Sequence, residues 1–238
     1  MFYYMFMPLD KHIDGGFGVT AEAFKEAAEK LAEGEQEDIF THSHLPINFL
    51  YRHAVELYLK SVIIVIHRSL GLSYGGKPAD LEPHVLREGK WLPIYRVHSV
   101  GTLYAYFKSL VMDNKEAIDK VAQTDWSAVP PELDEAIAVI DKADSGSTYF
   151  RYPITQDPSA DQEKSSWKDV PHTEVFRSMK PGAKPVKAFL VLDEDDQIVN
   201  SYQYDHEPLR HLREALRKAT ELLSGAHTGL RMELAGGR

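Results

Sequence analysis

The strongest constraint in this sequence is a long apolar segment, from about Pro46 to Leu70, that also carries a few charged side chains. Proline suits the first turn of a helix, and Gly71 suits the position just after its end. Because the segment is apolar on most sides, we expect it to be the central helix of a bundle. Its apolar run Val62 to Ile66, which ends at His67, is far shorter than the roughly 20 residues that span a bilayer. It therefore predicts a buried helix, and we expect no membrane partner.

Other segments predict the helices that pack around this one. Helical periodicity and suitable end residues mark Thr20 to Glu33, Ser99 to Met112, a helix opening at Pro130-Pro131, and a last helix from Pro208 to about Leu223, before Gly225. Residues 71–97 contain many glycines and prolines and predict a long loop with short turns. The sequence thus predicts a mainly α protein, with core helices at about 20–153 and 206–224.

The segment between the last two helices has a different composition. Residues 154–184 are polar and predict an extended insertion. Residues 186–192 and 197–204 are rich in β-forming side chains and flank the acidic turn 193–196, which predicts a β-hairpin. We therefore expect a single domain, residues 1–238, in which a small β-hairpin elaborates a helical bundle.

Composition narrows the function classes. The 238 residues include 27 Lys and Arg, 36 Asp and Glu, and no cysteine, which gives a net charge of −9. The lack of cysteine excludes thiol nucleophiles, disulfides and zinc–thiolate sites, and it fits a reducing cytoplasm. The acidic excess argues against a general nucleic-acid coat but permits a local basic patch. Phosphate-binding glycine loops are absent, so no cofactor is expected. The histidines of His42-x-His44 are expected to be solvent-exposed, so no metal is predicted.

The charged side chains of the central helix share one side. At about 100° per residue, Arg52, Glu56, Lys60, His53 and His67 fall within a single arc. Glu56 lies four residues from both Arg52 and Lys60, a spacing at which opposite charges attract. Two interpretations follow. The arc is a solvent-facing stripe or a satisfied salt-bridge seam between helices, or it is the floor of a polar cleft.

The segment Arg52-His53-Ala54-Val55-Glu56-Leu57-Tyr58-Leu59-Lys60 resembles the central helix of the HEPN-domain (higher eukaryote and prokaryote nucleotide-binding) proteins. His98 to Leu103 stands where that family has its His-x-x-x-Leu helix start. Asp144-Ser145 and Phe150-Arg151-Tyr152-Pro153 are similar to a segment that follows the bundle helices in bacterial members. The resemblance covers about residues 40–155 and the last helix, and it implies a HEPN-like helical bundle.

The resemblance also implies a range of functions. Many HEPN proteins are metal-independent ribonucleases of toxin, abortive-infection and antiviral defence systems, with an Arg-x(4–6)-His motif paired across a dimer. No arginine in this chain is followed by a histidine at that spacing. A histidine could still act as general acid or base beside an arginine that holds a phosphate. His53, His98 and Arg151 are the candidate catalytic residues.

Further residues are candidates for ligand binding. The seam residues Arg52, Glu56 and Lys60 would line a polar cleft. Arg151 lies between aromatic residues and just before a proline, so that it either pairs with Glu56 or faces a phosphate or base beside Tyr152. In the last helix, one face carries Arg210, Arg213 and Arg217, which would grip RNA or an acidic partner, or would simply complement the helix dipole.

Three functions remain open. The first is a HEPN-like protein of a defence or stress system that binds RNA, nucleotide or a partner protein without the usual ribonuclease motif. The second is a divergent ribonuclease with a rearranged His/Arg site. The third is a non-catalytic assembly protein. The apolar start, MFYYMFM, predicts a strand or arm packed on the body, or a contact in a homodimer.

Overall fold

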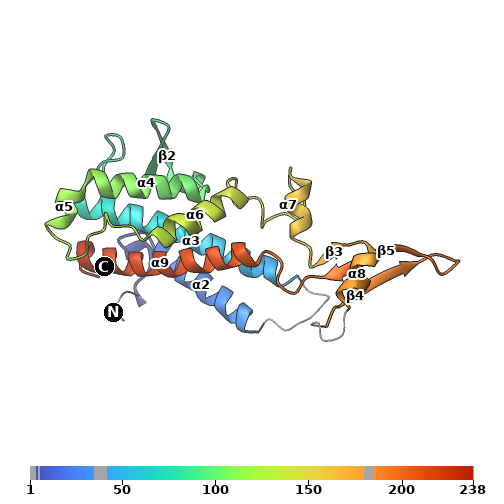
Figure 1. The fold of residues 1–238 in the computed structure, drawn as a ribbon. Helices are drawn as coiled ribbons and strands as arrows, with labels where there is room; N and C mark the ends of the chain where they lie inside the picture. Colours follow the sequence, from blue (N-terminus) through green and yellow to red (C-terminus); the bar gives the residue numbers. More distant parts are fainter. Residues whose placement is uncertain (1–3, 5, 35–41, 180–184, 238) are drawn as a thin grey trace.

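The computed structural model describes residues 4, 6–34, 42–179 and 185–237. Its main body is a bundle around α3 (His44–Leu70), whose residues from Ala54 to His67 are all buried (Figure 1). The long helices α2 (Phe17–Glu33) and α9 (Arg210–Ala235) pack against α3, and α4 (Val100–Asp113) and α6 (Pro131–Asp144) complete the bundle. The predictions of a mainly helical bundle and of a buried central helix are confirmed.

The first long helix begins earlier than predicted. We expected Thr20 to cap it, but α2 begins at Phe17 because the Asp14 carboxylate accepts hydrogen bonds from the backbone N–H groups of Gly16 and Gly18 at 3.0 and 2.7 Å. The Thr20 hydroxyl instead donates to the carbonyl of Gly16, inside the first turn. An acidic side chain at this position satisfies amide groups that the helix leaves without partners.

Residues 71–97 are more ordered than a loop, so this prediction was wrong. They form an antiparallel hairpin of β1 (His84–Arg87) and β2 (Lys90–Pro93), followed by the 3₁₀-helix η2 (Ile94–Arg96). Glu88 and Gly89 both have positive φ, at 50° and 76°, which is the geometry of a tight two-residue hairpin turn. A short helix, α5 (Lys115–Asp119), follows α4, and the 3₁₀-helix η1 (Leu9–Lys11) precedes α2.

The last helix is longer than predicted. We expected it to stop before Gly225, but α9 continues to Ala235 and ends at Gly236, which has a φ of 60°. The buried stripe continues past the glycine through His227 and Leu230. Burial of that stripe outweighs the poor helix propensity of one glycine, which costs only about 1 kcal/mol.

A small sheet projects from one end of the bundle (Figure 1). Its strands are β3 (Trp167–Asp169), β4 (Ala188–Leu192) and β5 (Ile198–Tyr204), all antiparallel in the order β3-β5-β4. The predicted hairpin is therefore confirmed. The prediction of an extended insertion was wrong for residues 154–179, which contain α7 (Pro158–Glu163), β3 and α8 (His172–Ser178). Residues 180–184 lie outside the described part.

The apolar start of the chain is only partly described, since residues 1–3 and 5 lie outside the described part. Tyr4 is buried: its ring lies under the Arg231 guanidinium, 3.8 Å from the ring centroid, and its hydroxyl is 3.4 Å from His227 Nε2. Phe6 is 82% exposed. Tyr4 thus behaves as part of an arm packed on the body. No helix in the described ranges is both long and apolar enough to cross a membrane.

Candidate functional site

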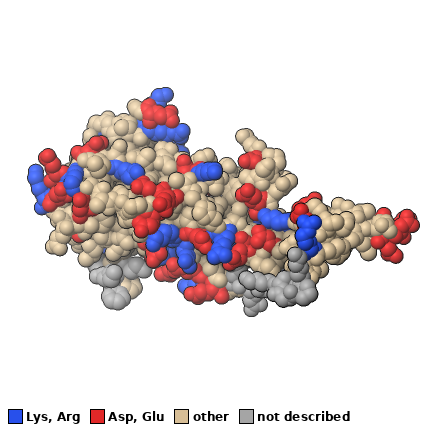
Figure 2. Space-filling view, viewed as in Figure 1, with Lys and Arg blue, Asp and Glu red and all other residues tan. Residues whose placement is uncertain are grey.

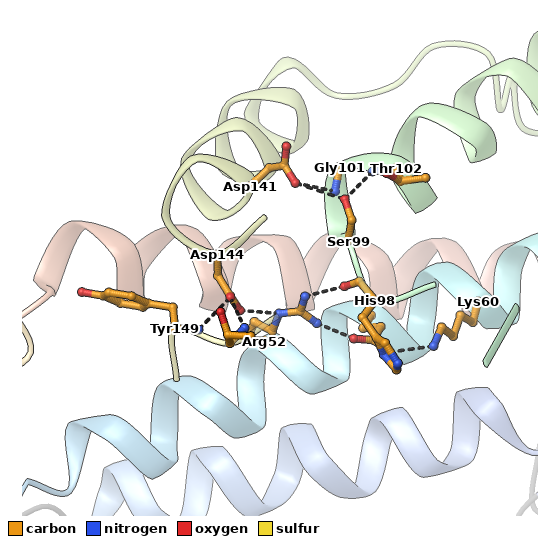
Figure 3. A network of polar contacts seen from close by, with 11 residues as sticks. Arg52, Lys60, His98, Ser99, Gly101, Thr102, Asp141, Asp144 and Tyr149 are labelled. Atoms are coloured by element: carbon orange, nitrogen blue, oxygen red, sulfur yellow. Dashed lines mark hydrogen bonds and ion pairs between the residues drawn. The ribbon is translucent and has the colours of Figure 1, made fainter. Parts of the chain in front are cut away.

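Three charged residues of α3 form a sealed ionic seam (Figure 3). Arg52, Glu56 and Lys60 are at most 3% exposed. Lys60 Nζ donates to Glu56 Oε1 at 2.7 Å, and Arg52 Nη1 donates to Glu56 Oε2 at 2.5 Å. The spacing of four residues places each cation one turn from the shared carboxylate. These three residues therefore form the satisfied seam of the first interpretation and not the floor of an open cleft.

Arg52 also joins the seam to two neighbouring elements. Its Nε donates to Asp144 Oδ2, at the end of α6, at 2.9 Å, and its Nη2 donates to the carbonyl of His98, just before α4, at 2.5 Å. The other Asp144 oxygen accepts the backbone N–H groups of Thr148 and Tyr149 at 2.7 and 3.0 Å. One guanidinium thus fixes α3, the turn after α6 and the start of α4 relative to one another.

A second contact between α4 and α6 supports the same segment. The Ser99 hydroxyl caps α4 by accepting the N–H of Thr102 at 3.1 Å, and Asp141 accepts the N–H of Gly101 at 3.1 Å. A Cβ on Gly101 would lie 2.4 Å from the Asp141 carboxyl carbon, so a larger residue would displace the Asp141 side chain from this contact. The backbone beside His98 is therefore held on both sides.

The seam reaches solvent at His98. The His98 side chain is 43% exposed, and its Nδ1 lies 3.0 Å from Glu56 Oε1. Burial alone would raise the pKa of Glu56, but the charges of Lys60 and Arg52 and the hydrogen bond with His98 outweigh it, so the pKa is below its usual value. The ionised Glu56 favours a proton on Nδ1 of His98, which leaves Nε2 directed away from the seam as the reactive nitrogen.

Arg151 acts electrostatically on two groups of α3, Lys60 and His53. Burial lowers the pKa of Lys60, with Arg52 and Arg151 adding to the effect against the opposing influence of Glu56. Burial likewise lowers the pKa of His53, and Arg151 again contributes. The exposed Arg151 guanidinium is thus near both groups, and it makes no hydrogen bond or ion pair with any described residue.

His53 is half-buried and packs between two aromatic rings. Its ring meets Phe24 of α2 edge-on at 4.5 Å between centroids and is stacked on Phe49 at 6.0 Å. Tyr152, the other predicted neighbour of Arg151, is 57% exposed, and its carbonyl accepts a hydrogen bond from Lys164. Of the three predicted catalytic residues, His98 contacts the seam directly and Arg151 acts on it electrostatically, and both are open to solvent, whereas His53 is largely occupied in packing.

His67 does not belong to this site, contrary to the helical-wheel prediction. Its Nε2 lies 2.7 Å from the Tyr106 hydroxyl, its Nδ1 lies 3.0 Å from the Leu72 carbonyl, and its ring stacks on Tyr74 at 4.2 Å. Burial lowers its pKa. His67 shares an angular position with the seam but lies seven residues beyond Lys60, about 10 Å farther along the helix axis.

One of the three arginines on the predicted basic face of the last helix is neutralised by acidic neighbours. Arg210 pairs with Glu207 and Glu214, both at 2.9 Å. Arg213 and Arg217 both lower the pKa of Tyr51, which burial raises, so they lie beside Tyr51 and not beside Glu56. Figure 2 shows Lys and Arg alternating with Asp and Glu over this part of the surface. These three arginines do not join the His98 site.

A second polar network was missed from the sequence. Asp14, fully buried, accepts a hydrogen bond from the Ser61 hydroxyl at 2.6 Å and lies 3.5 Å from His227 Nε2. Burial opposes ionisation, but the contacts with His227 and Ser61 hold the pKa of Asp14 below its usual value. The network joins the start of α2 to α3 and α9. Since its members lie far apart in sequence, no local spacing marked it.

The polar stripe of α3 also extends farther toward the start of the helix. His44 and Asn48 continue the spacing of four residues back from Arg52, and both are buried. We expected both histidines of His42-x-His44 to be solvent-exposed; His42 is exposed, but the prediction was wrong for His44. His44 Nε2 lies 2.7 Å from the carbonyl of Lys164, which gives this histidine a structural contact. The same repeat that marked the seam would have found both residues. In the described ranges, no three His, Asp or Glu side chains are grouped to hold a metal ion.

A cavity of about 690 Å³ lies on the far side of Asp144, between α6, α7 and the start of α9. Its charged lining residues are mostly occupied: Asp144 pairs with Arg52, Asp157 caps α7, and Arg210 pairs with two glutamates. His98 and Arg151 are therefore the better candidates for contact with a charged ligand. Comparisons of the chain with protein-family models, with curated proteins and with solved structures gave no match.

Proposed function

We propose that this chain is a HEPN-like protein that binds RNA, or a nucleotide part of it, through phosphate contacts at the solvent end of the seam. The observation that carries the proposal is the local charge. Arg52 and Lys60 form ion pairs with Glu56 and Asp144, whereas the exposed Arg151, which acts electrostatically on Lys60 and His53, pairs with no described residue, and His98 lies partly exposed beside Glu56. This charge stands out on a chain whose net charge is −9.

The chemistry of the exposed groups suits a phosphate. The Arg151 guanidinium offers a planar set of donors that match two phosphate oxygens. The His98 imidazole can donate a further hydrogen bond from Nε2 when it is protonated. Tyr152, the residue after Arg151, is 57% exposed and offers a ring on which a base can stack. The resemblance to HEPN proteins adds the expectation of a cytoplasmic role in defence or stress, and a partner protein remains within the proposal.

Fluorescence anisotropy with a labelled 20-nucleotide single-stranded RNA tests this proposal. We expect Arg151→Ala to weaken binding about 3- to 10-fold and to reduce the slope of log K against log salt by about 0.7, the value for one phosphate contact on a single strand. Arg87→Ala is the matched control, because Arg87 is an exposed arginine on β1 whose side chain pairs only with Glu88 among the described residues. Absence of binding by the wild type, or equal effects of the two substitutions, would refute the proposal.

A second candidate function, a divergent metal-independent ribonuclease, is favoured by the contact between Glu56 and His98. A buried carboxylate that orients an exposed imidazole is a common arrangement for a general base. In this scheme His98 Nε2 takes the proton of an RNA 2′-hydroxyl, and the 2′-oxygen forms a bond to the adjacent phosphorus. The bond between phosphorus and the 5′-oxygen breaks, and the leaving 5′-oxygen takes a proton from water. Arg151 would hold the phosphate.

Cleavage of the same RNA in the presence of EDTA separates the two functions. For a ribonuclease, we expect a 2′,3′-cyclic phosphate product, a pH-dependent rate, and a loss of at least about 100-fold in His98→Asn. If the wild type binds RNA but leaves it intact, the chain is a binding protein and the catalytic candidate is wrong.

A further inference from the structure

The open edge of the projecting sheet points to a second surface, unrelated to the His98 site. Among the described residues, β4 pairs only with β5, so its other side has no strand partner. The five residues of β4, Ala188-Phe189-Leu190-Val191-Leu192, are all apolar. Phe189 and Leu192 are 57% and 51% exposed. Such an edge is ready to pair with another strand.

The backbone contacts show which groups face this open side. The carbonyl of Lys187 accepts the N–H of Tyr204 at 2.9 Å, and the N–H of Asp193 donates to the carbonyl of Gln197 at 2.9 Å. Odd-numbered residues of this strand therefore bond to β5. Since the hydrogen-bonding side alternates along a strand, the N–H and C=O groups of Ala188, Leu190 and Leu192 point outward.

The two edges of the sheet differ in how they are protected. The other edge, β3, is three residues long and carries Lys168 and Asp169. Short length and charge are common means of preventing edge-to-edge pairing. β4 has neither a charge nor a proline over its whole length. The contrast indicates that β4 is the edge on which pairing takes place.

We propose that β4 pairs antiparallel with β4 of a second copy of this chain, around a two-fold axis at Leu190, to form a continuous six-stranded sheet. In this register, a residue that precedes Leu190 by a given number of positions in one copy lies opposite the residue that follows Leu190 by the same number in the other copy. Ala188 then faces Leu192 of the second copy, and Phe189 faces Val191, so that each exposed apolar side chain packs beside an apolar side chain of the other copy.

Charge complementarity favours a second copy over other partners. In this register Lys187 faces Asp193 of the second copy, and the reverse pair forms at the other end. The acidic turn at residues 193–196 forms the tip of the sheet, where Figure 2 shows a group of Asp and Glu. A nucleic acid would be repelled by this tip, whereas the two-fold axis brings each tip to a lysine.

Sedimentation or light scattering over a range of about 5 to 300 μM tests the proposal. A five-residue edge buries little surface, so we expect a weak dimer whose mass rises with concentration from 27.0 kDa toward twice that value. Ala188→Pro removes an outward N–H that β5 does not use, and it is expected to raise the dimer dissociation constant at least tenfold while circular dichroism and the melting temperature stay unchanged.

A charge substitution provides an independent check. Lys187→Glu sets like charges against each other across the axis and is expected to weaken the dimer severalfold, most strongly at low salt. Lys218→Glu is the matched control, since it makes the same change at an exposed position on α9. A wild type that stays monomeric at 300 μM overturns the proposal, even if the edge then captures a strand of another protein. A dimer that Ala188→Pro leaves as tight as before overturns it as well.

Discussion

Removal of the Arg52 guanidinium is the sharpest test of the seam. In Arg52→Met, the apolar part of the side chain is retained, but Asp144, Glu56 and the carbonyl of His98 each lose a hydrogen bond. Both carboxylates stay buried, at 4% and 1% exposure. Glu56 keeps Lys60 and His98 as partners, whereas among the described residues Asp144 keeps only the backbone N–H groups of the turn after α6.

The size of the effect follows from burial. Removing one partner of a buried ion pair costs about 3–5 kcal/mol, because the remaining charge has lost both its solvent and its partner. For a domain of this length, each kcal/mol lowers the melting temperature by about 2–4 °C, so we expect a decrease of about 6–20 °C. Calorimetry at pH 7 measures the melting temperature, and urea unfolding measures the free energy of unfolding.

The chain offers a close control for this substitution. Arg210 and Glu214 repeat the spacing of Arg52 and Glu56 and the same type of contact, at 2.9 Å, but on the exposed surface. Exposed ion pairs contribute little, so Arg210→Met is expected to leave the melting temperature nearly unchanged. If Arg52→Met destabilises the protein no more than Arg210→Met does, the seam is not a structural element and this reasoning is wrong.

Three further predictions concern the helices and their buried acids. Gly18→Ala places a Cβ 2.2 Å from His227 Nε2 and should lower the free energy of unfolding by about 1–3 kcal/mol in urea titration. Gly225→Ala, where nothing lies within 4 Å, should raise the same quantity by about 0.5–1 kcal/mol; a decrease would contradict it. Asp14 and Glu56 have lowered pKa values and so bind fewer protons folded than unfolded. Stability is therefore expected to fall as pH drops below about 5, with a shallower fall in Asp14→Asn.

Local patterns predicted the parts of the fold and site that depend on neighbours in sequence. The contacts of Glu56 with Arg52 and Lys60 follow from a spacing of four residues, which any helix imposes. The partnership of Arg52 with Asp144 spans 92 residues and depends on how α3 and α6 pack. No periodicity within one helix contains that information.

The errors have equally specific causes. His67 was assigned to the seam from its angle alone, although position along the axis decides contact. Gly225 was taken as a helix end, although the buried stripe continues beyond it. In both cases a one-residue signal was outweighed by packing.

Substitutions at Arg52 and Arg151 should affect stability and RNA binding differently. Measuring both properties in both variants tests the proposed function more strictly than loss of binding alone. Arg52 supports the fold and also holds the backbone of His98, so its removal should weaken both. Arg151 is exposed and unpaired among the described residues, so its removal should weaken RNA binding and leave the melting temperature unchanged. A substitution at Arg151 that destabilised the fold as much as one at Arg52 would mean that both belong to a structural network. The exposed end of the seam would then need a different explanation.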